Sequence, residues 1–179
     1  MPVARHPMPP EVAALSLDQI AAGNVARFDD RVADWNAFED AKIEGYHRCQ
    51  RRYIGAGASG KHDDGSFVPS RGFTLAVLYV EPGQGNAAHT HEVEEAFFVL
   101  DGELTTFLED GNGERREVKL RKWDCIVSPP GVIHGFVNKS DKPVYLQVML
   151  GRGRPETMGY ADDTLFARRD AHLVSASKA

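Results

Sequence analysis

The sequence contains few cysteines. Only Cys49 and Cys125 occur among 179 residues, far apart and without the C-x-x-C spacing of a metal or redox site. A disulfide-stabilised secreted scaffold and a cysteine-based zinc site are therefore excluded. We expect reduced thiols in a cytoplasmic protein, with Cys125 as a small core residue and not a nucleophile.

Long apolar runs and basic clusters are missing as well. No stretch approaches the roughly 18 apolar residues of a membrane span, and residues 1–10 lack the apolar segment of a secretory signal. The 21 lysines and arginines stand against 26 acidic residues, for a net charge of −5. We therefore expect neither a membrane nor a nucleic acid as partner. The length and the 42% hydrophobic content fit one domain with extensions.

The two ends of the chain are predicted to extend this domain. In residues 1–45, Ser16 and Gln19 have the spacing of a helix capping box, and Gly23 can end that helix. Apolar residues recur near a helical period across residues 32–41, which predicts a second helix. Residues 151–179 are expected to form a loop, a closing helix near residues 163–173 and a polar tail.

Residues 46–150 have the pattern of an all-β domain. Many short β-rich segments are separated by turn sequences and not by helices, which predicts an antiparallel sandwich or barrel. The expected strands are residues 46–54, 73–80, 93–100, 104–108, 116–120, 123–127, 132–137 and 144–150. Residues 55–60 match the dinucleotide motif G-x-G-x-x-G, but they lead into a turn composition and not a helix. We interpret them as a flexible loop.

Three histidines and a glutamate provide a set of potential metal ligands. His89, His91 and Glu95 all have odd numbers, so they lie on one face of an extended segment. His134 comes from a later strand and can supply a fourth donor. Three imidazole nitrogens and one carboxylate oxygen suit Fe, Mn, Ni, Zn or Cu, and leave one or two positions open on an octahedral ion.

These segments resemble the two motifs of the cupin superfamily. The first motif, G-x5-H-x-H-x3-4-E-x6-G, is matched by Gly83, His89, His91, Glu95 and Gly102. The second, G-x5-P-x-G-x2-H-x3-N, is matched by Pro129, Gly131, His134 and Asn138, with Trp123 in place of its first glycine. Because a tryptophan adopts positive φ only at a cost, we expect a different turn shape at Trp123.

The resemblance covers about residues 70–150. It implies a jelly-roll β-barrel, commonly a homodimer, with one divalent transition metal ion per chain, iron or manganese being favoured. The ion is expected inside the barrel, on His89, His91, Glu95 and His134. Among the remaining histidines, His62 can reach the barrel mouth, and the others, His6, His47 and His172, are expected at the surface.

A small-molecule pocket is predicted from the strand register. If residues 132–137 and 144–150 form a hairpin, His134 lies opposite Gln147; a hairpin at Asp101 likewise places Thr106 opposite Phe97. The predicted lining is Phe97, Thr106, Leu108, Phe136, Tyr145, Gln147 and Met149. A slip of one residue in either turn would invert these assignments.

The resemblance to cupin dioxygenases implies a function. We expect a metal-dependent, dioxygenase-type oxidoreductase acting on a small phenolic or dicarbonyl-like substrate, with Glu95 leaving the metal to act as catalytic base. A metal-dependent isomerase or lyase is the alternative within the enzyme class. A non-catalytic small-molecule-binding module is the alternative outside it. Arg152 and Arg154 can hold an anionic substrate at the rim, although solvated loop arginines are commoner.

Overall fold

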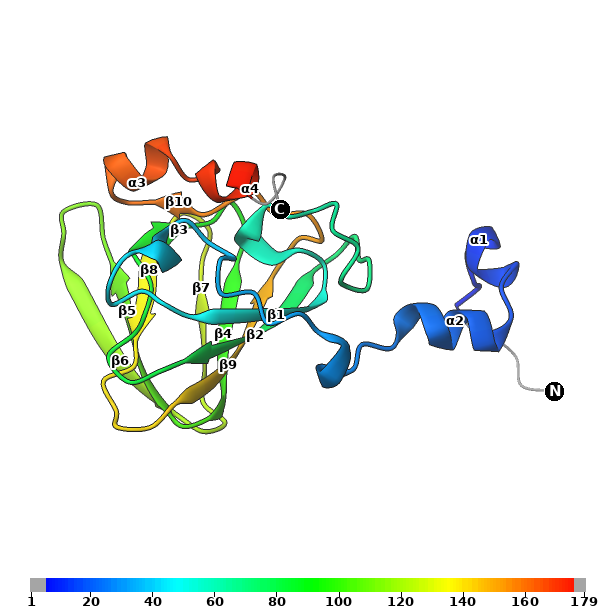
Figure 1. Ribbon diagram of the computed structural model, residues 1–179, viewed down its shortest axis with the longest axis horizontal. Coiled ribbons are helices and arrows are strands. Elements are labelled where there is room, and N and C mark those ends of the chain that lie inside the picture. The colour runs from blue at the N-terminus through cyan, green and yellow to red at the C-terminus, as the bar shows by residue number, and fades with distance from the viewer. Residues whose placement is uncertain (1–5, 176–179) are drawn as a thin grey trace.

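The protein is built from two five-stranded antiparallel sheets that face each other (Figure 1). The computed structural model describes residues 6–175; the first five residues of the Pro-rich N-terminus and residues 176–179 of the predicted polar tail lie outside them. Sheet A contains, in order, β1 (Cys49–Ile54), β2 (Thr74–Val80), β9 (Val144–Leu150), β4 (Glu95–Asp101) and β7 (Cys125–Ser128). Sheet B contains β10 (Gly159–Tyr160), β3 (His89–Thr90), β8 (Ile133–Val137), β5 (Glu103–Glu109) and β6 (Arg115–Arg121). The predicted all-β jelly roll is confirmed.

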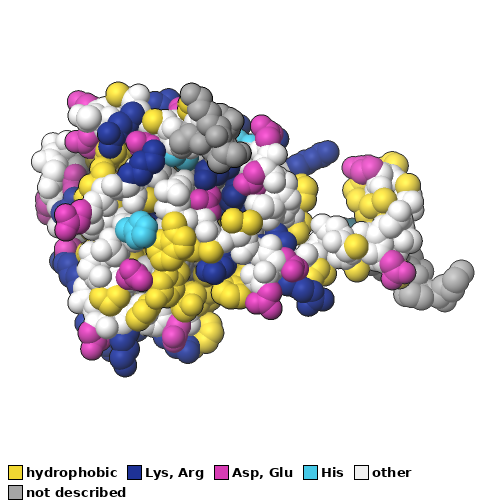
Figure 2. Space-filling model, viewed as in Figure 1, with side chains coloured by type: hydrophobic (Ala, Val, Ile, Leu, Met, Phe, Trp, Pro, Cys, Tyr) yellow, Lys and Arg dark blue, Asp and Glu magenta, His cyan; other side chains and the backbone are white. Residues whose placement is uncertain are grey.

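The core lies between the sheets because side chains alternate along each strand. On β9, burial alternates at every position, and Val144, Leu146 and Leu150 are almost fully buried. Phe97 and Phe136 meet edge to face across the two sheets, with ring centroids 5.4 Å apart. The apolar core therefore lies between the sheets, and hydrophobic side chains also gather on the surface in the region where Figure 1 places β2 and β9 (Figure 2).

The two hairpins from which the pocket was predicted are not formed, so that prediction is wrong. β8 belongs to sheet B and pairs with β3 and β5, whereas β9 belongs to sheet A and pairs with β2 and β4. β4 and β5 likewise lie in different sheets. In each case the chain crosses from one sheet to the other after a short turn, so residues on the two strands are not cross-strand partners.

The N-terminal extension is only partly helical. α1 (Pro10–Ala13) precedes α2 (Leu17–Asn24), whose N-terminus has the predicted capping box: the Gln19 amide donates to Ser16 Oγ at 3.1 Å, and the Ser16 amide donates to Gln19 Oε1 at 2.8 Å. The second predicted helix is wrong. Residues 32–41 contain only the start of a 3₁₀ turn, η2 (Asp40–Lys42), which follows η1 (Phe28–Asp30). Phe38 is buried in the barrel core from this irregular segment, so burial and not a helix explains the apolar spacing.

Irregular segments close one end of the barrel. Residues 55–59 are buried and contain the 3₁₀ turn η3 (Gly57–Ser59), so they do not open a dinucleotide-binding helix, as expected. The predicted closing helix is divided into α3 (Asp163–Ala167) and α4 (Ala171–Ser175). His172 on α4 is 3% exposed, contrary to the surface position expected, and its Nε2 lies 2.8 Å from the carbonyl oxygen of Ser59. No helix among residues 6–175 has the length and apolarity needed to cross a membrane.

Trp123 keeps the turn shape that its motif position requires of glycine. Its φ is +75°, the single positive value of a non-glycine residue within the described part of the chain. The Trp123 amide donates to Val99 O at 2.8 Å, and Asp124 accepts the Arg121 amide at 2.8 Å. The expectation of a different turn is therefore wrong: these bonds hold the turn, and the protein bears the strain.

Candidate metal centre

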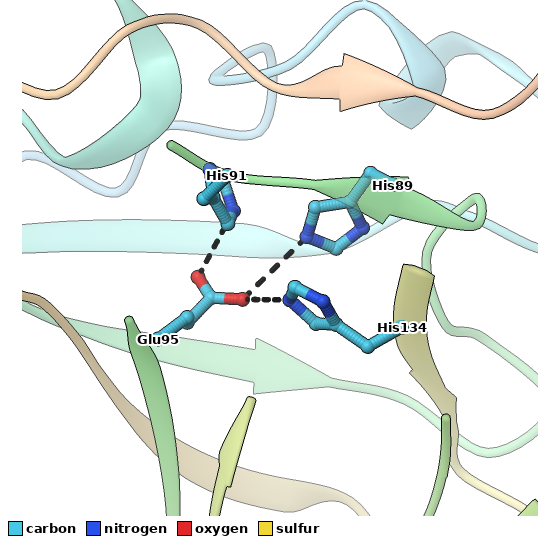
Figure 3. A group of neighbouring side chains, drawn as sticks. All are labelled: His89, His91, Glu95 and His134. Carbon is cyan, nitrogen blue, oxygen red and sulfur yellow. Dashed lines mark hydrogen bonds and ion pairs between the residues drawn. The ribbon is translucent and has the colours of Figure 1, made fainter. Parts of the chain in front are cut away.

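The candidate ligands come from both sheets. His89 on β3 and His134 on β8 are cross-strand partners, so their side chains share the inner face of sheet B. His91 follows β3, and Glu95 begins β4 in sheet A. Figure 3 shows the three imidazoles grouped around the Glu95 carboxylate. One potential ligand atom from each residue lies within 4.8 Å of all the others.

The glutamate is at the centre of this cluster. Its Oε2 lies 2.8 Å from His134 Nε2 and 3.5 Å from His89 Nε2, and its Oε1 lies 3.4 Å from His91 Nε2. All four residues are at most 5% exposed. Solvent is therefore largely excluded, and the four donors face one another.

The ring nitrogens fit metal coordination. His89 Nδ1 lies 2.9 Å from Ala87 O and His134 Nδ1 lies 2.8 Å from Val132 O, so both Nδ1 atoms are placed to donate. That tautomer leaves each Nε2 lone pair toward the cluster, as in metal-ligating histidines. Neither ring nitrogen of His91 makes a hydrogen bond to the described residues, although both are buried. A divalent ion would satisfy His91 Nε2, so the donor set fits such an ion.

The charges in the cluster are strongly coupled. Burial lowers the pKa of His89 to about 4. Burial also opposes the charge on Glu95, but the charge of His91 and the interactions with His134 and His89 hold the Glu95 pKa well below its usual range. Burial lowers the pKa of His134, yet hydrogen bonding to Glu95 and the Glu95 charge outweigh it and raise that pKa. Glu95 is thus a carboxylate at neutral pH, ready to act as a ligand or a base.

A small cavity adjoins the cluster. Its volume is about 20 Å³, enough for about one water molecule. His89 and Glu95 form one side, and the other walls come mainly from apolar residues that include Phe97, Phe136 and Met158. The cavity therefore admits one small group beside the candidate ligands.

The predicted pocket residues divide into three groups. Phe97 and Phe136 line the cavity. Thr106 and Leu108 are on the inner side of β5, opposite Phe136 and His134, but they do not line the cavity; Thr106 is buried and its hydroxyl donates to Val118 O at 3.2 Å. The three predicted β9 residues, Tyr145, Gln147 and Met149, lie on the half-buried outer face of sheet A. Their placement was wrong because β9 does not pair with β8.

Sequence reasoning missed several buried polar residues near the cluster, among them Thr74 and Asn86, which also line the cavity. Arg48 and Gln50 line the cavity from the start of sheet A. Ser128 is the cross-strand partner of Glu95, is 1% exposed, and has a hydroxyl without a hydrogen-bond partner in the described chain. The alternation of polar residues at Arg48 and Gln50, on either side of Cys49, was visible in the sequence. It did not predict the cavity, because alternating polar residues on a strand normally indicate the side that faces solvent.

The other singled-out residues lie away from the cluster. His47 is exposed as expected and stacks on Trp35, with ring centroids 4.8 Å apart; His6 is also exposed. His62 lines surface hollows with Asp63 and not the metal cluster. Arg152 and Arg154 are exposed and lie 3.5 Å from Glu92 and Asp63, respectively. Cys125 is exposed on the outer face of β7, so the core position expected for it is wrong.

Comparisons with known proteins agree with this architecture. Residues 76–150 match the family model of the cupin domain. No curated protein sequence matches the chain. Among solved structures, the polyketide cyclase RemF from Streptomyces resistomycificus is 19% identical, with 79% of this chain and 89% of that chain covered and a TM-score of 0.56.

Two oxalate decarboxylases are also similar in fold. The Bacillus subtilis enzyme, which has Mn(II) centres, is 18% identical over 76% of this chain and 33% of its own, with a TM-score of 0.54. The Lactobacillus farciminis enzyme, solved as a formate complex, is 16% identical over 80% of this chain and 39% of its own, with a TM-score of 0.53. This chain thus corresponds to little more than a third of either enzyme. The motifs, the two-sheet barrel and the family match together show that residues 76–150 form a cupin domain.

Proposed function

We propose that the protein is a metal-dependent enzyme, of the dioxygenase type, that acts on a small phenolic or dicarbonyl-like substrate. The observation that carries the proposal is the buried cluster of three imidazoles and one carboxylate, in which the His91 nitrogens have no hydrogen-bond partner among the described residues. Three nitrogen donors and one oxygen donor suit one divalent ion per chain and leave coordination positions open; iron and manganese are our first choices.

A divalent ion in this cluster would supply a Lewis acid that lowers the pKa of an enol or phenol and a place for dioxygen to bind. The chain supplies the proton-transfer groups. Glu95 is ionised because its pKa is held low, and it lies 2.8 Å from His134, whose pKa is raised. If the Glu95 carboxylate leaves the ion, it can accept a proton from a bound substrate and hold it, while His134 remains a ligand.

The apolar walls suit a substrate with little charge. The apolar side chains of Phe97, Phe136 and Met158 lower the polarity around the cavity, which strengthens electrostatic interactions there. The cavity volume of about 20 Å³ is too small for an aromatic ring. We therefore propose that the segments carrying Phe38, Ala58 and Met158, which line the cavity from outside the long strands, move when the substrate enters.

Two measurements test the proposal. Elemental analysis of protein purified without added metal should find about one transition metal ion per chain, and His89→Ala should lose it. The Fe(II) form should then consume oxygen in an electrode when small phenols or β-diketones are added. Bound metal with no uptake for any candidate would count heavily against dioxygenase chemistry.

Non-oxidative isomerase or lyase chemistry is the second candidate. It is favoured by the Glu95 carboxylate in the cluster, since one base can take a proton from one substrate atom and return it to another without an oxidant. The similarity to a polyketide cyclase is compatible with it but shows only a common fold. Conversion of a diketone or phenol by the metal-loaded protein under strict anaerobiosis would favour this candidate. Tight binding with recovery of unchanged ligand would instead indicate a binding module.

A further inference from the structure

The inner face at the start of sheet A is polar. Arg48, Gln50 and Arg52 alternate there and are 1%, 2% and 5% exposed. The inward side chains of the central strand β9 are instead Val144, Leu146, Val148 and Leu150. Burying polar groups destabilises a protein unless each finds a partner. The polar alternation at β1 therefore requires an explanation.

The two arginines are accounted for by neighbouring carboxylates. Arg48 forms a bidentate ion pair with Asp40, with nitrogen–oxygen distances of 3.0 and 3.1 Å. Arg52 pairs with Asp64. Both guanidinium charges are thus neutralised within the fold, and neither arginine is available as a free cation for an anionic ligand.

Two polar atoms remain without a partner. Gln50 Oε1 and Arg48 Nε are buried and make no hydrogen bond to any of the described residues. Both residues line the cavity that His89 and Glu95 also line, and that cavity holds about 20 Å³. An unpaired acceptor, an unpaired donor and a water-sized space therefore adjoin the candidate metal centre.

The chemistry of these atoms selects their ligand. Arg48 Nε–H can only donate, and Gln50 Oε1 can only accept. A hydroxyl both accepts and donates, whereas a carboxylate would place negative charge against Gln50 Oε1 without a free cation to offset it. We propose that Gln50 and Arg48 form a subsite for a neutral hydroxyl of the substrate, whose other oxygen binds at the metal centre. This inference rests on the proposed function and narrows its substrate class to hydroxyl-bearing molecules.

Three small carboxylates test the subsite. Propionate, 3-hydroxypropionate and malonate can each place one carboxylate on the metal, and they differ at the far end by a methyl, a hydroxyl or a second carboxylate. Their binding to the Zn(II)-loaded protein is measured by calorimetry. We expect 3-hydroxypropionate to bind about tenfold more tightly than the other two, the usual effect of pairing an otherwise unsatisfied buried group.

Gln50→Leu and Gln50→Met should remove this preference. Both variants should also raise the Tm of the ligand-free protein, because they replace an unpaired buried acceptor with an apolar group. Gln147→Leu is the matched control: the same change on the outer face of β9 should leave the preference intact. A merely structural Gln50 would lower the Tm when replaced and would not alter the selectivity.

The outcomes separate the two proposals. Absence of Zn(II) binding would overturn the metal-dependent function itself. Zn(II) binding without a preference for 3-hydroxypropionate, or with a preference that survives in both Gln50 variants, would overturn the subsite and leave the proposed function standing. If the hydroxyl of 3-hydroxypropionate only chelates the metal, its tighter binding should survive in both Gln50 variants. Failure of all three probes to bind the metal-loaded protein would also overturn the subsite.

Discussion

The buried Arg48–Asp40 pair offers a quantitative test of how the N-terminal segment is attached to the barrel. Arg48 is 1% exposed and Asp40 is fully buried. Asp40 also accepts the Ala87 amide at 2.9 Å and the Tyr160 hydroxyl at 3.1 Å. One carboxylate therefore connects the segment before β1, the approach to β3 and the strand β10.

Removing one charge of this pair should destabilise the fold much more than removing both. Arg48→Met leaves Asp40 buried without its cation, and Asp40→Asn leaves the Arg48 charge unpaired; breaking such a pair costs about 3–5 kcal/mol. The hydrogen bonds from Ala87 and Tyr160 remain with Asp40, so we expect Arg48→Met near the lower end, about 3 kcal/mol. For a chain of this size that is a Tm decrease of roughly 6–12 °C. The double variant contains no buried charge and should cost less than either single change.

Urea unfolding followed by tryptophan fluorescence measures these values, with equal m-values as the check that the denatured states are comparable. The double-mutant cycle should give a coupling energy of more than about 3 kcal/mol. Additive losses, with the double variant the least stable, would show that the pair is not electrostatically coupled and would refute the reasoning.

Four further predictions follow from the site and the backbone. Mn(II) at a hundred times its Kd should stabilise the wild type by about 2.7 kcal/mol. In a thermal-shift assay with an EDTA control, His134→Ala should lose this stabilisation, whereas His47→Ala, which removes an exposed imidazole, should keep it. Equal stabilisation of both variants would rule out the cluster as the metal site. The metal-free protein should lose stability as the pH falls from 6.5 to 4, because burial lowers the pKa of His89 to about 4 and favours its neutral form, which stabilises the fold only above the unfolded pKa. At about 1.36 kcal/mol for each of about 2.5 pKa units, this loss is at most about 3.4 kcal/mol. The raised pKa of His134 offsets part of it by favouring the protonated form. Urea midpoints in EDTA should show a flatter pH profile for His89→Gln, and an unchanged profile would contradict this cause. Gly153→Ala should lower the free energy of unfolding in urea by roughly 1–3 kcal/mol, because a Cβ there overlaps the Ser70 carbonyl oxygen. Gly111→Ala is the control, because its Cβ meets nothing within 4 Å. Equal losses in the two variants would disprove the steric cause. Trp123→Gly relieves about 1–2 kcal/mol of strain from the left-handed backbone conformation, but it loses the contact with Phe98. We therefore expect the free energy of unfolding to change by no more than about 1 kcal/mol and the metal content to stay complete. A much larger loss of stability would mean that the Trp123 side chain holds the turn.

The ligand cluster could be predicted because it depends on local spacing. Alternation along an extended chain places His89, His91 and Glu95 on one side whatever the topology, and the resemblance to the second motif added His134. The strand segments followed from their period for the same reason. The prediction that β9 faces inward at Gln147 failed because it required knowing which strands pair, and pairing is decided by the packing of the whole sandwich.

Two other features depend on tertiary context that local patterns do not contain. Phe38 and its neighbours have helical spacing but are held in an irregular segment by core packing and by the Asp40 ion pair. Trp123 violates the usual preference of its backbone conformation because its motif position fixes the turn between β6 and β7. In both cases long-range contacts outweigh an intrinsic preference of about 1 kcal/mol per residue.

The distribution of the four donors over two sheets has a consequence for biogenesis. His89, His91 and Glu95 are close neighbours in sequence and can capture an ion while the rest of the chain is still unstructured, whereas His134 arrives only when β8 joins β3. Such early capture would lower the apparent stabilisation by the ion, since the unfolded chain then competes for it. It would also tether the β3–β4 segment in a compact loop before the sandwich closes. Refolding rates measured with the ion present from the start, against rates with the ion added afterwards, distinguish an ion that guides assembly from one that enters a finished barrel.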